Sequence, residues 1–196
     1  MNILVIKSSV FGDNGNSSSL VNSQLAALQA QHPDATVVVR DLSTDPIPHL
    51  DGERVGAFFT PADQRSDDQQ AVDASSMALI DELKTADHIV LGLPMYNFGI
   101  PSQLKSWIDH VARAGITFRY TENGPQGLLD DKPVTVLAAR GGLYAGTEND
   151  TVTPYIKLFF GFIGMTDVNF VYAEGLNMGD ETKEKAMSEA QAALAG

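Results

Sequence analysis

The chain of 196 residues contains no cysteine, which excludes disulfide bonds, thiolate nucleophiles and cysteine-based metal sites. Histidine is scarce as well, with only His32, His49, His88 and His110. These four do not cluster with carboxylates at the spacings typical of metal ligands, so we expect no metal site. A serine nucleophile such as Ser9 would need an activating histidine after the fourth or fifth predicted strand. None of the four histidines lies there, which disfavours a serine hydrolase.

Positive charge is in short supply, because 13 lysines and arginines stand against 25 acidic residues, for a formal net charge of −12. The negative electrostatic field of such a chain disfavours nucleic acid and anionic membranes as partners. It still permits one local anion site built from backbone amides. No apolar run approaches the ~20 residues of a membrane span. The N-terminal stretch MNILVIKSSV lacks the basic region of a signal peptide. We therefore expect a cytoplasmic protein that binds neither nucleic acid nor membrane.

Familiar nucleotide-binding motifs are also missing. The glycine spacing at Gly141–Gly146 lacks the lysine of the triphosphate-binding loop, and no Gly-x-Gly-x-x-Gly follows the first apolar run. A phosphorylatable receiver domain would need aspartates where the chain reads Lys7-Ser8-Ser9 and Pro94-Met95-Tyr96.

What the chain does contain is a regular alternation of apolar runs and helical patterns. Strands are predicted at Ile3–Ile6, Thr36–Arg40, His88–Leu93, Pro133–Ala139 and Val168–Ala173, and helices near 17–31, 67–84, 151–164 and 181–194 and from Pro101 onward. Uninterrupted apolar strands are typical of a parallel sheet covered on both faces. We predict an α/β, flavodoxin-like, doubly wound sheet of five strands in the order 2-1-3-4-5. Residues 1–196 are expected to form a single domain with a hairpin-like excursion near 116–130.

Ligands of such a sheet bind beyond the carboxyl ends of the strands, where strands 1 and 3 diverge. Three loops rich in Gly, Ser and Asn should meet there, namely Ser9–Ser19, Pro94–Gly99 and Ala139–Tyr144. The first leads into a helix whose free N–H groups, joined by serine hydroxyls, can bind a phosphate. Ordinary capping of that helix by Ser17 or Ser18 is the alternative.

The second loop is bracketed by Pro94 and Pro101. Proline restricts the residue before it to extended conformations, and Pro101 suits the first position of a helix. Met95–Phe98 should therefore form a constrained turn that can hold a flat ligand. A stiff connector with exposed aromatic residues is the alternative.

A phosphate site beside a planar slot describes a site for flavin mononucleotide (FMN). The backbone after the third strand can hydrogen-bond the carbonyl and N5 edge of the flavin ring. Amides of Gly141 and Gly142, with Arg140 nearby, can stabilise negative charge that develops at N1 and the C2 carbonyl on reduction. For Arg140 a surface salt bridge is an equally weighted alternative.

The chain resembles the FMN-dependent NADH:quinone oxidoreductases, also called azoreductases. The resemblance covers nearly the whole chain and is strongest in Met95-Tyr96-Asn97-Phe98, in FRYTENGP at 118–125 and in Arg140-Gly141-Gly142. It implies a homodimer with one FMN per subunit and NADH as electron donor. It further implies ping-pong transfer of hydride through flavin N5 to quinones or azo compounds, with no certain catalytic side chain.

By position, the resemblance assigns the cofactor contacts to Ser9, Gly15, Asn16, Ser17, Pro94, Met95, Tyr96, Asn97, Phe98, Ala139, Arg140, Gly141 and Gly142. It assigns Asn97, Phe98, Tyr120 and Phe162 to the substrate, with Tyr120 and Phe162 covering the flavin of the opposite subunit. The family often has Ser-Gln-Ser at Gly15-Asn16-Ser17 and serine at Ala139. These departures remove side-chain donors, so phosphate contact should lean more on amides, Ser17 and Ser18. The apolar excess around Phe159–Met165 fits an interface, and a well-buried helix is the alternative.

Two other functions remain open on the sequence. A one-electron flavin carrier would share the fold, but it would not need the FRYTENGP excursion or the apolar helix. A non-catalytic binding module could have kept the fold and lost the cofactor. The segment Asp51–Arg65 could be a lid, and Arg54, Arg65 or Arg119 could meet the 2′-phosphate of NADPH, so the preference for NADH rests on the resemblance.

Overall fold

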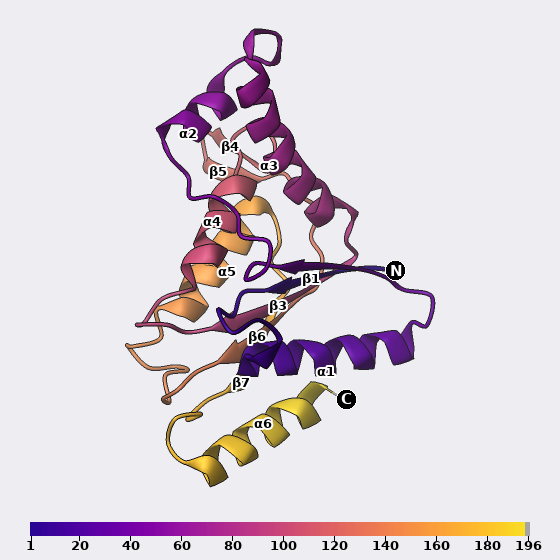
Figure 1. Ribbon diagram of the computed structural model, residues 1–196, viewed down its shortest axis with the longest axis vertical. Coiled ribbons are helices and arrows are strands. Elements are labelled where there is room, and N and C mark those ends of the chain that lie inside the picture. The colour runs from indigo at the N-terminus through magenta and orange to yellow at the C-terminus, as the bar shows by residue number, and fades with distance from the viewer. Residues whose placement is uncertain (195–196) are drawn as a thin grey trace.

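The computed structural model describes residues 1–194 and has a five-stranded parallel sheet at its centre (Figure 1). The strands are β1 (Asn2–Lys7), β2 (Thr36–Asp41), β3 (His88–Pro94), β6 (Val134–Ala139) and β7 (Val168–Ala173). Their spatial order is β2-β1-β3-β6-β7, and neighbouring strands pair in parallel. Counted along the parallel sheet, this is the predicted order 2-1-3-4-5, which is confirmed.

Helices cover both faces of this sheet, as Figure 1 shows. On one face lie α1 (Asn16–Gln31) and α6 (Asp180–Leu194), and on the other α3 (Asp67–Thr85), α4 (Ser102–Val111) and α5 (Val152–Ile163). The alternation of side chains along a strand divides the core accordingly. In β1, Leu4 and Ile6 join the apolar cluster beneath α3, α4 and α5, whereas Ile3 and Val5 join the cluster with α1 and α6.

Two segments lie outside this plan. The prolines and glycine of the long connection before α3 predict no more than one short helical turn, around Glu53–Phe58. The connection instead contains the helix α2 (Gly52–Phe59) and a 3₁₀ turn at Ala62–Gln64. Strands β4 (Phe118–Thr121) and β5 (Gly124–Gly127) form a separate antiparallel pair. The alternating pattern of Ile116–Tyr120 predicts a strand from Ile116. β4 instead begins at Phe118, because the N–H groups of Ile116 and Thr117 both donate to the Arg113 carbonyl and close a turn there.

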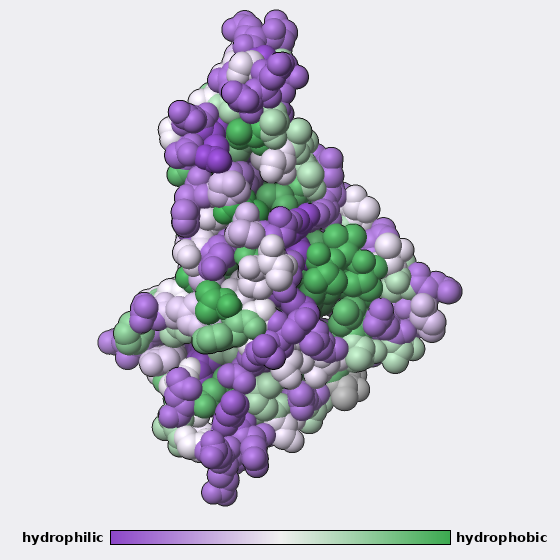
Figure 2. Space-filling model, viewed as in Figure 1, coloured by the Kyte–Doolittle hydropathy of each residue, from purple (hydrophilic) through white to green (hydrophobic). Residues whose placement is uncertain are grey.

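Polar residues cover most of the surface in the view of Figure 2, and the broadest apolar patch lies over the β1–β2 edge of the sheet. Val38 and Val39 of the edge strand β2 are 42% and 51% exposed. Within residues 1–194, no helix has the length and apolar character needed to cross a membrane.

Candidate functional site

A cleft of about 170 Å³ lies beyond the carboxyl ends of β1, β3 and β6. It is lined by residues of all three predicted loops: Ser9, Asn16, Ser17, Pro94, Met95, Tyr96, Ala139, Arg140 and Gly141. Phe11, Leu176 and Asn177 complete the lining. The cleft thus sits where the strand order reverses, which is the expected ligand position in a doubly wound sheet.

The first turn of α1 forms one end of the cleft. Its N-cap is Gly15, which has no side chain to cap the helix, and the first helical hydrogen bond runs from the Ser19 N–H to the Gly15 carbonyl. Within the described part of the chain, the N–H groups of Asn16, Ser17 and Ser18 have no hydrogen-bond partner. The Ser17 hydroxyl is buried and also lacks a partner. Unpaired donors at a helix N-terminus suit an anion, so the capping alternative does not describe this helix.

Gly15 is needed because the loop after β1 folds tightly against the helix. A Cβ atom at position 15 would lie 2.2 Å from the Ser9 Oγ. That hydroxyl accepts a hydrogen bond from the Phe11 N–H at 3.2 Å and lies 3.3 Å from the Tyr96 hydroxyl. Ser18 holds the same loop, since its hydroxyl donates to the Gly12 carbonyl at 2.7 Å. Because this hydroxyl is used within the loop, any contact of Ser18 with a phosphate would come from its backbone N–H group.

The turn after β3 is strained at its tip. Tyr96 and Gly99 exchange two backbone hydrogen bonds of 2.9 Å, and Asn97 and Phe98 between them have φ angles of +49° and +62°. Asparagine tolerates this left-handed conformation, but a phenylalanine rarely adopts it. Strain of this kind persists where the surroundings enforce it, and it gathers at functional sites.

The same turn offers donors to a ligand. Among residues 1–194, no group accepts a hydrogen bond from the N–H of Asn97 or of Phe98. The Phe98 ring is 56% exposed and also borders a second cavity of about 370 Å³ beside Thr151 and Tyr155. Free amides and an exposed aromatic ring on a rigid turn favour the flat-ligand interpretation over a plain connector.

The loop after β6 is pinned to the segment after β7. The carbonyls of Gly141 and Gly142 accept hydrogen bonds of 3.0 Å from the N–H groups of Asn177 and Gly175. A Cβ at Gly141 would lie 2.5 Å from the side-chain nitrogen of Asn177, so a larger residue there would displace that amide. The two glycine N–H groups have no partner in the described chain and can serve a ligand.

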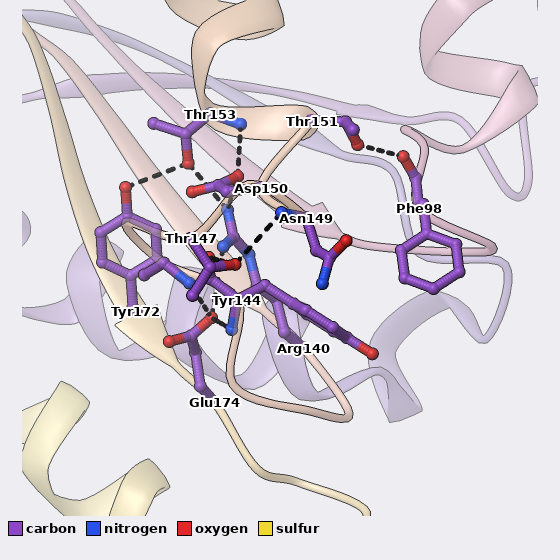
Figure 3. Close-up of polar contacts among 11 residues, drawn as sticks. Phe98, Arg140, Tyr144, Thr147, Asn149, Asp150, Thr151, Thr153, Tyr172 and Glu174 are labelled. Carbon is purple, nitrogen blue, oxygen red and sulfur yellow. Dashed lines mark hydrogen bonds and ion pairs between the residues drawn. The ribbon is translucent and has the colours of Figure 1, made fainter.

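Arg140 does not offer its charge to the cleft. Its guanidinium, 1% exposed, donates to Asp150 at 2.9 Å, to Thr153 at 2.7 Å and to Glu174 at 3.2 Å, as Figure 3 shows. Burial alone would raise the pKa of Asp150, but the hydrogen bonds from Arg140 and Thr153 hold that pKa below its ordinary value. Direct stabilisation of a reduced flavin by Arg140 is thus not supported. The salt bridge of the alternative interpretation is present, although it is buried rather than at the surface.

Four of the predicted cofactor contacts do not line the cleft: Gly15, Asn97, Phe98 and Gly142. Gly15 lies behind Ser9, and Asn97 and Phe98 form the tip of the turn. Tyr120 and Phe162 also lie outside the cleft. Tyr120 is 75% exposed on β4, and the ring of Phe162 packs on that of Phe118 at a centroid distance of 4.2 Å.

Sequence reasoning missed Phe11, Leu176 and Asn177. A signal for the latter two was present, because the segment after β7 reads Glu174-Gly175-Leu176-Asn177 and shares the Gly and Asn content of the other three loops. Its Gly175 has a φ of +73°, which turns the chain back towards the cleft.

Comparison with known proteins gives a consistent result. A protein-family profile described as "Flavodoxin-like fold" matches residues 1–196. The FMN-dependent NADH:quinone oxidoreductase of Alcanivorax borkumensis is 82% identical over 194 residues, covering 99% of this chain and 98% of that protein. The enzyme of the same name from Cellvibrio japonicus is 55% identical over 189 residues, covering 96% and 94%.

Solved structures with the same architecture include azoreductase AzrA, with a TM-score of 0.90 at 29% identity, covering 100% of this chain and 97% of that one. An FMN-dependent NADH-azoreductase from Bacillus anthracis, solved in complex with FMN, has a TM-score of 0.88 at 27% identity, covering 99% and 97%.

Proposed function

The chain belongs to the family of FMN-dependent NADH:quinone oxidoreductases with a flavodoxin-like fold, and on this premise we propose that it reduces quinones and azo compounds with NADH as electron donor. One observation carries the proposal. The uncapped start of α1, with the unpartnered hydroxyl of Ser17, faces the same cleft as the turn after β3 and the glycine loop after β6. The donors for a phosphate and those for a flat ring therefore converge.

These donors fit FMN in three groups. The N–H groups of Asn16, Ser17 and Ser18, with the Ser17 hydroxyl, would hold the phosphate. The N–H groups of Asn97 and Phe98 would meet the edge of the ring. Those of Gly141 and Gly142 would stabilise the negative charge that reduction places on it.

Bound FMN would supply the redox chemistry, a two-electron transfer of hydride from NADH to the acceptor in a ping-pong sequence. The protein would bind and orient the reactants. The rings of Phe11 and Tyr96 in the cleft, and the exposed ring of Phe98 on the turn after β3, would provide aromatic walls that keep water from them. The described lining of the cleft holds no carboxylate, and its one charged side chain, Arg140, is paired. Side-chain acid–base catalysis is therefore not part of the proposal.

The contacts of the candidate arginines favour NADH over NADPH as the electron donor. Each arginine that could meet a 2′-phosphate already has a partner: Arg54 pairs with Asp51, Arg65 with Asp73 at 2.5 Å, and Arg119 donates to Gln126 at 2.9 Å. The net charge of −12 adds a general repulsion for a further phosphate.

The proposal includes a cytoplasmic, single-domain homodimer in which Tyr120 and Phe162 of the partner subunit cover the flavin. Leu158 supports this arrangement, because it is 72% exposed on α5, one turn before Phe162 and on the same side of the helix. An apolar surface of this kind is typical of an interface.

The test compares FMN with riboflavin, which lacks the phosphate. Replacing Ser17 by Ala should weaken FMN binding at least tenfold, since a hydrogen bond to a charged group contributes about 1.5–3 kcal/mol, and should leave riboflavin binding unchanged. Ser23→Ala, on the same helix away from the cleft, is the control. Binding would be measured by quenching of flavin fluorescence.

Turnover separates the rival functions. The wild-type protein should oxidise NADH with benzoquinone as acceptor. A one-electron carrier would bind FMN without oxidising NADH, and a binding module that has lost its cofactor would show no affinity for FMN. Either result would contradict the proposed function.

A further inference from the structure

Glu174 braces the loop after β6 from the end of β7. One of its carboxylate oxygens accepts hydrogen bonds from the N–H groups of Tyr144 and Ala145, both at 2.9 Å, and from the Arg140 guanidinium at 3.2 Å (Figure 3). Arg140 precedes Gly141, and Tyr144 lies two residues after Gly142. A single side chain therefore holds both ends of the segment whose glycine amides face the proposed flavin.

A further set of hydrogen bonds links Arg140 to the turn after β3. Arg140 donates to Asp150, which also accepts the Thr153 N–H at 3.0 Å and so fixes the start of α5. The next residue, Thr151, donates its hydroxyl to the carbonyl of Phe98, the strained residue at the tip of the turn. Figure 3 shows this path from Glu174 to Phe98.

Stability alone is a poor reason for such a network. Buried ion pairs often contribute no more to stability than well-packed apolar residues do, because desolvation offsets their attraction. The planar fork of an arginine does, however, fix the relative positions of the groups that it bridges. Here the bridged groups belong to the ends of β6 and β7 and the start of α5.

We propose that Glu174 is a positioning residue for the flavin. It holds the segment that carries the Gly141 and Gly142 amides by binding Arg140 before it and Tyr144 and Ala145 after it. It holds the turn at Asn97–Phe98 through Arg140, Asp150 and Thr151. The proposal rests on the proposed function. Glu174 acts through its accepting oxygen and not through its charge, which Arg140 and the two loop amides already satisfy.

The central experiment compares Glu174→Ala with Glu174→Gln, since glutamine keeps an accepting oxygen without the charge. Glu174→Ala should weaken FMN binding at least tenfold and lower the reduction potential of the bound flavin. Both effects are expected because the N–H groups of Gly141 and Gly142 would no longer point at the reduced ring. Glu174→Gln should restore most of both properties. A role of the charge itself would instead make the two variants alike, and that result would overturn the proposal.

Asp131 provides a matched control. Its carboxylate also braces a loop, accepting from the Thr166 N–H at 2.8 Å and the Thr166 hydroxyl at 2.7 Å, but it lies before β6, at the opposite end of the sheet. Asp131→Ala should lower the melting temperature without changing FMN affinity or potential. If Glu174→Ala does only the same, Glu174 is merely structural and the proposal fails.

A double-mutant cycle tests the link from Glu174 through Thr151 to Phe98. Thr151→Val removes the hydroxyl that holds Phe98, and combined with Glu174→Ala it should weaken FMN binding by a factor at least threefold smaller than the product of the single effects. Strictly multiplicative effects would overturn the link between the two loops.

Hydrogen exchange of the FMN-free protein separates this proposal from the proposed function. The amides of Tyr144 and Ala145 should be protected in wild type and lose that protection in Glu174→Ala, whether or not flavin binds. Unchanged protection would overturn the positioning role, whereas a wild-type protein that binds no FMN would overturn the function instead.

Discussion

At the scale of the residue, Gly15 shows how closely the loop after β1 approaches α1. Its φ of −72° and ψ of 143° suit any amino acid, so the requirement for glycine comes from crowding alone. A Cβ there would lie 2.2 Å from the Ser9 Oγ and 2.6 Å from the Ser9 Cβ, and the Cβ is fixed to the backbone, so rotation of the serine side chain cannot relieve the contact.

Gly15→Ala should therefore displace the loop, lower the free energy of unfolding by about 1–3 kcal/mol and weaken FMN binding at least tenfold. Urea denaturation and flavin fluorescence measure the two effects. Gly56→Ala is the control, because that helical glycine has nothing within 4 Å of its Cβ position, and it should stabilise the protein by up to ~1 kcal/mol. Equal behaviour of the two variants would refute the crowding at Gly15.

Phe98 carries a conformational cost that a different residue would avoid. Asparagine tolerates a φ of +62° better than phenylalanine does. Phe98→Asn should thus raise the free energy of unfolding by up to ~1 kcal/mol while lowering quinone turnover, because an aromatic wall of the site is lost. Phe11→Asn should not gain stability, since Phe11 is also exposed (67%, against 56% for Phe98) but has a φ of −92°. A Phe98→Asn variant without any gain would show that the turn is unstrained.

At the scale of the element, the sequence predicts most of the fold because each central strand is a continuous apolar run. Ile3–Ile6 is buried on both faces, as the pattern indicates. The sequence underestimates α2, because prolines at 46, 48 and 61 mark its surroundings as irregular. The helix nevertheless forms, with Asp51 capping it through the Arg54 N–H at 2.9 Å.

The candidate site, like the fold, could be predicted from the sequence only in part. The strand order alone brings the three predicted loops together, so their residues could be placed from the sequence. The direction of the Arg140 side chain could not, because it depends on Asp150 and on Glu174, which lies 34 residues away along the chain. Leu176 and Asn177 were missed because they belong to a fourth loop, after β7, that packs against the loop after β6.

The segment Asp51–Arg65 is tied down more firmly than a free lid would be. Asp73 of α3 accepts from Arg65 at 2.5 Å and from Arg113 at 2.7 Å. The Arg113 guanidinium is buried, and its Cζ lies 3.9 Å from the centre of the Phe58 ring of α2. These contacts join α2 to α3 and to the end of α4.

Asp73→Ala should lower the free energy of unfolding by about 3 kcal/mol, because it leaves the buried Arg113 guanidinium without its carboxylate. The matched variant Glu189→Ala removes an exposed helical ion-pair partner, that of Lys185, and should change stability little. Chemical denaturation of both variants measures the difference. A cost no larger than that of Glu189→Ala would mean that Arg65 and Arg113 do not depend on Asp73.

At the scale of the whole molecule, two apolar surfaces compete as the interface of the proposed homodimer. One is α5, where Leu158 is exposed and Phe162 lies one turn further along the same side. The other is the β2 edge of the sheet, where Val38 and Val39 are exposed and where Figure 2 shows an apolar patch. Only the α5 surface carries a residue that the proposed function assigns to the flavin of the partner subunit, so we expect α5 to be the interface.

Leu158→Asp should therefore convert the dimer to a monomer of 21.0 kDa and abolish quinone turnover, because a charge cannot be buried there without a partner. Val39→Asp should leave the dimer and its turnover intact. Sedimentation velocity measures the mass. Phe162→Ala should keep the dimer but lower turnover, since it removes only the aromatic cover. If Val39→Asp dissociates the dimer instead, or if Phe162→Ala leaves turnover unchanged, the cross-subunit arrangement is wrong.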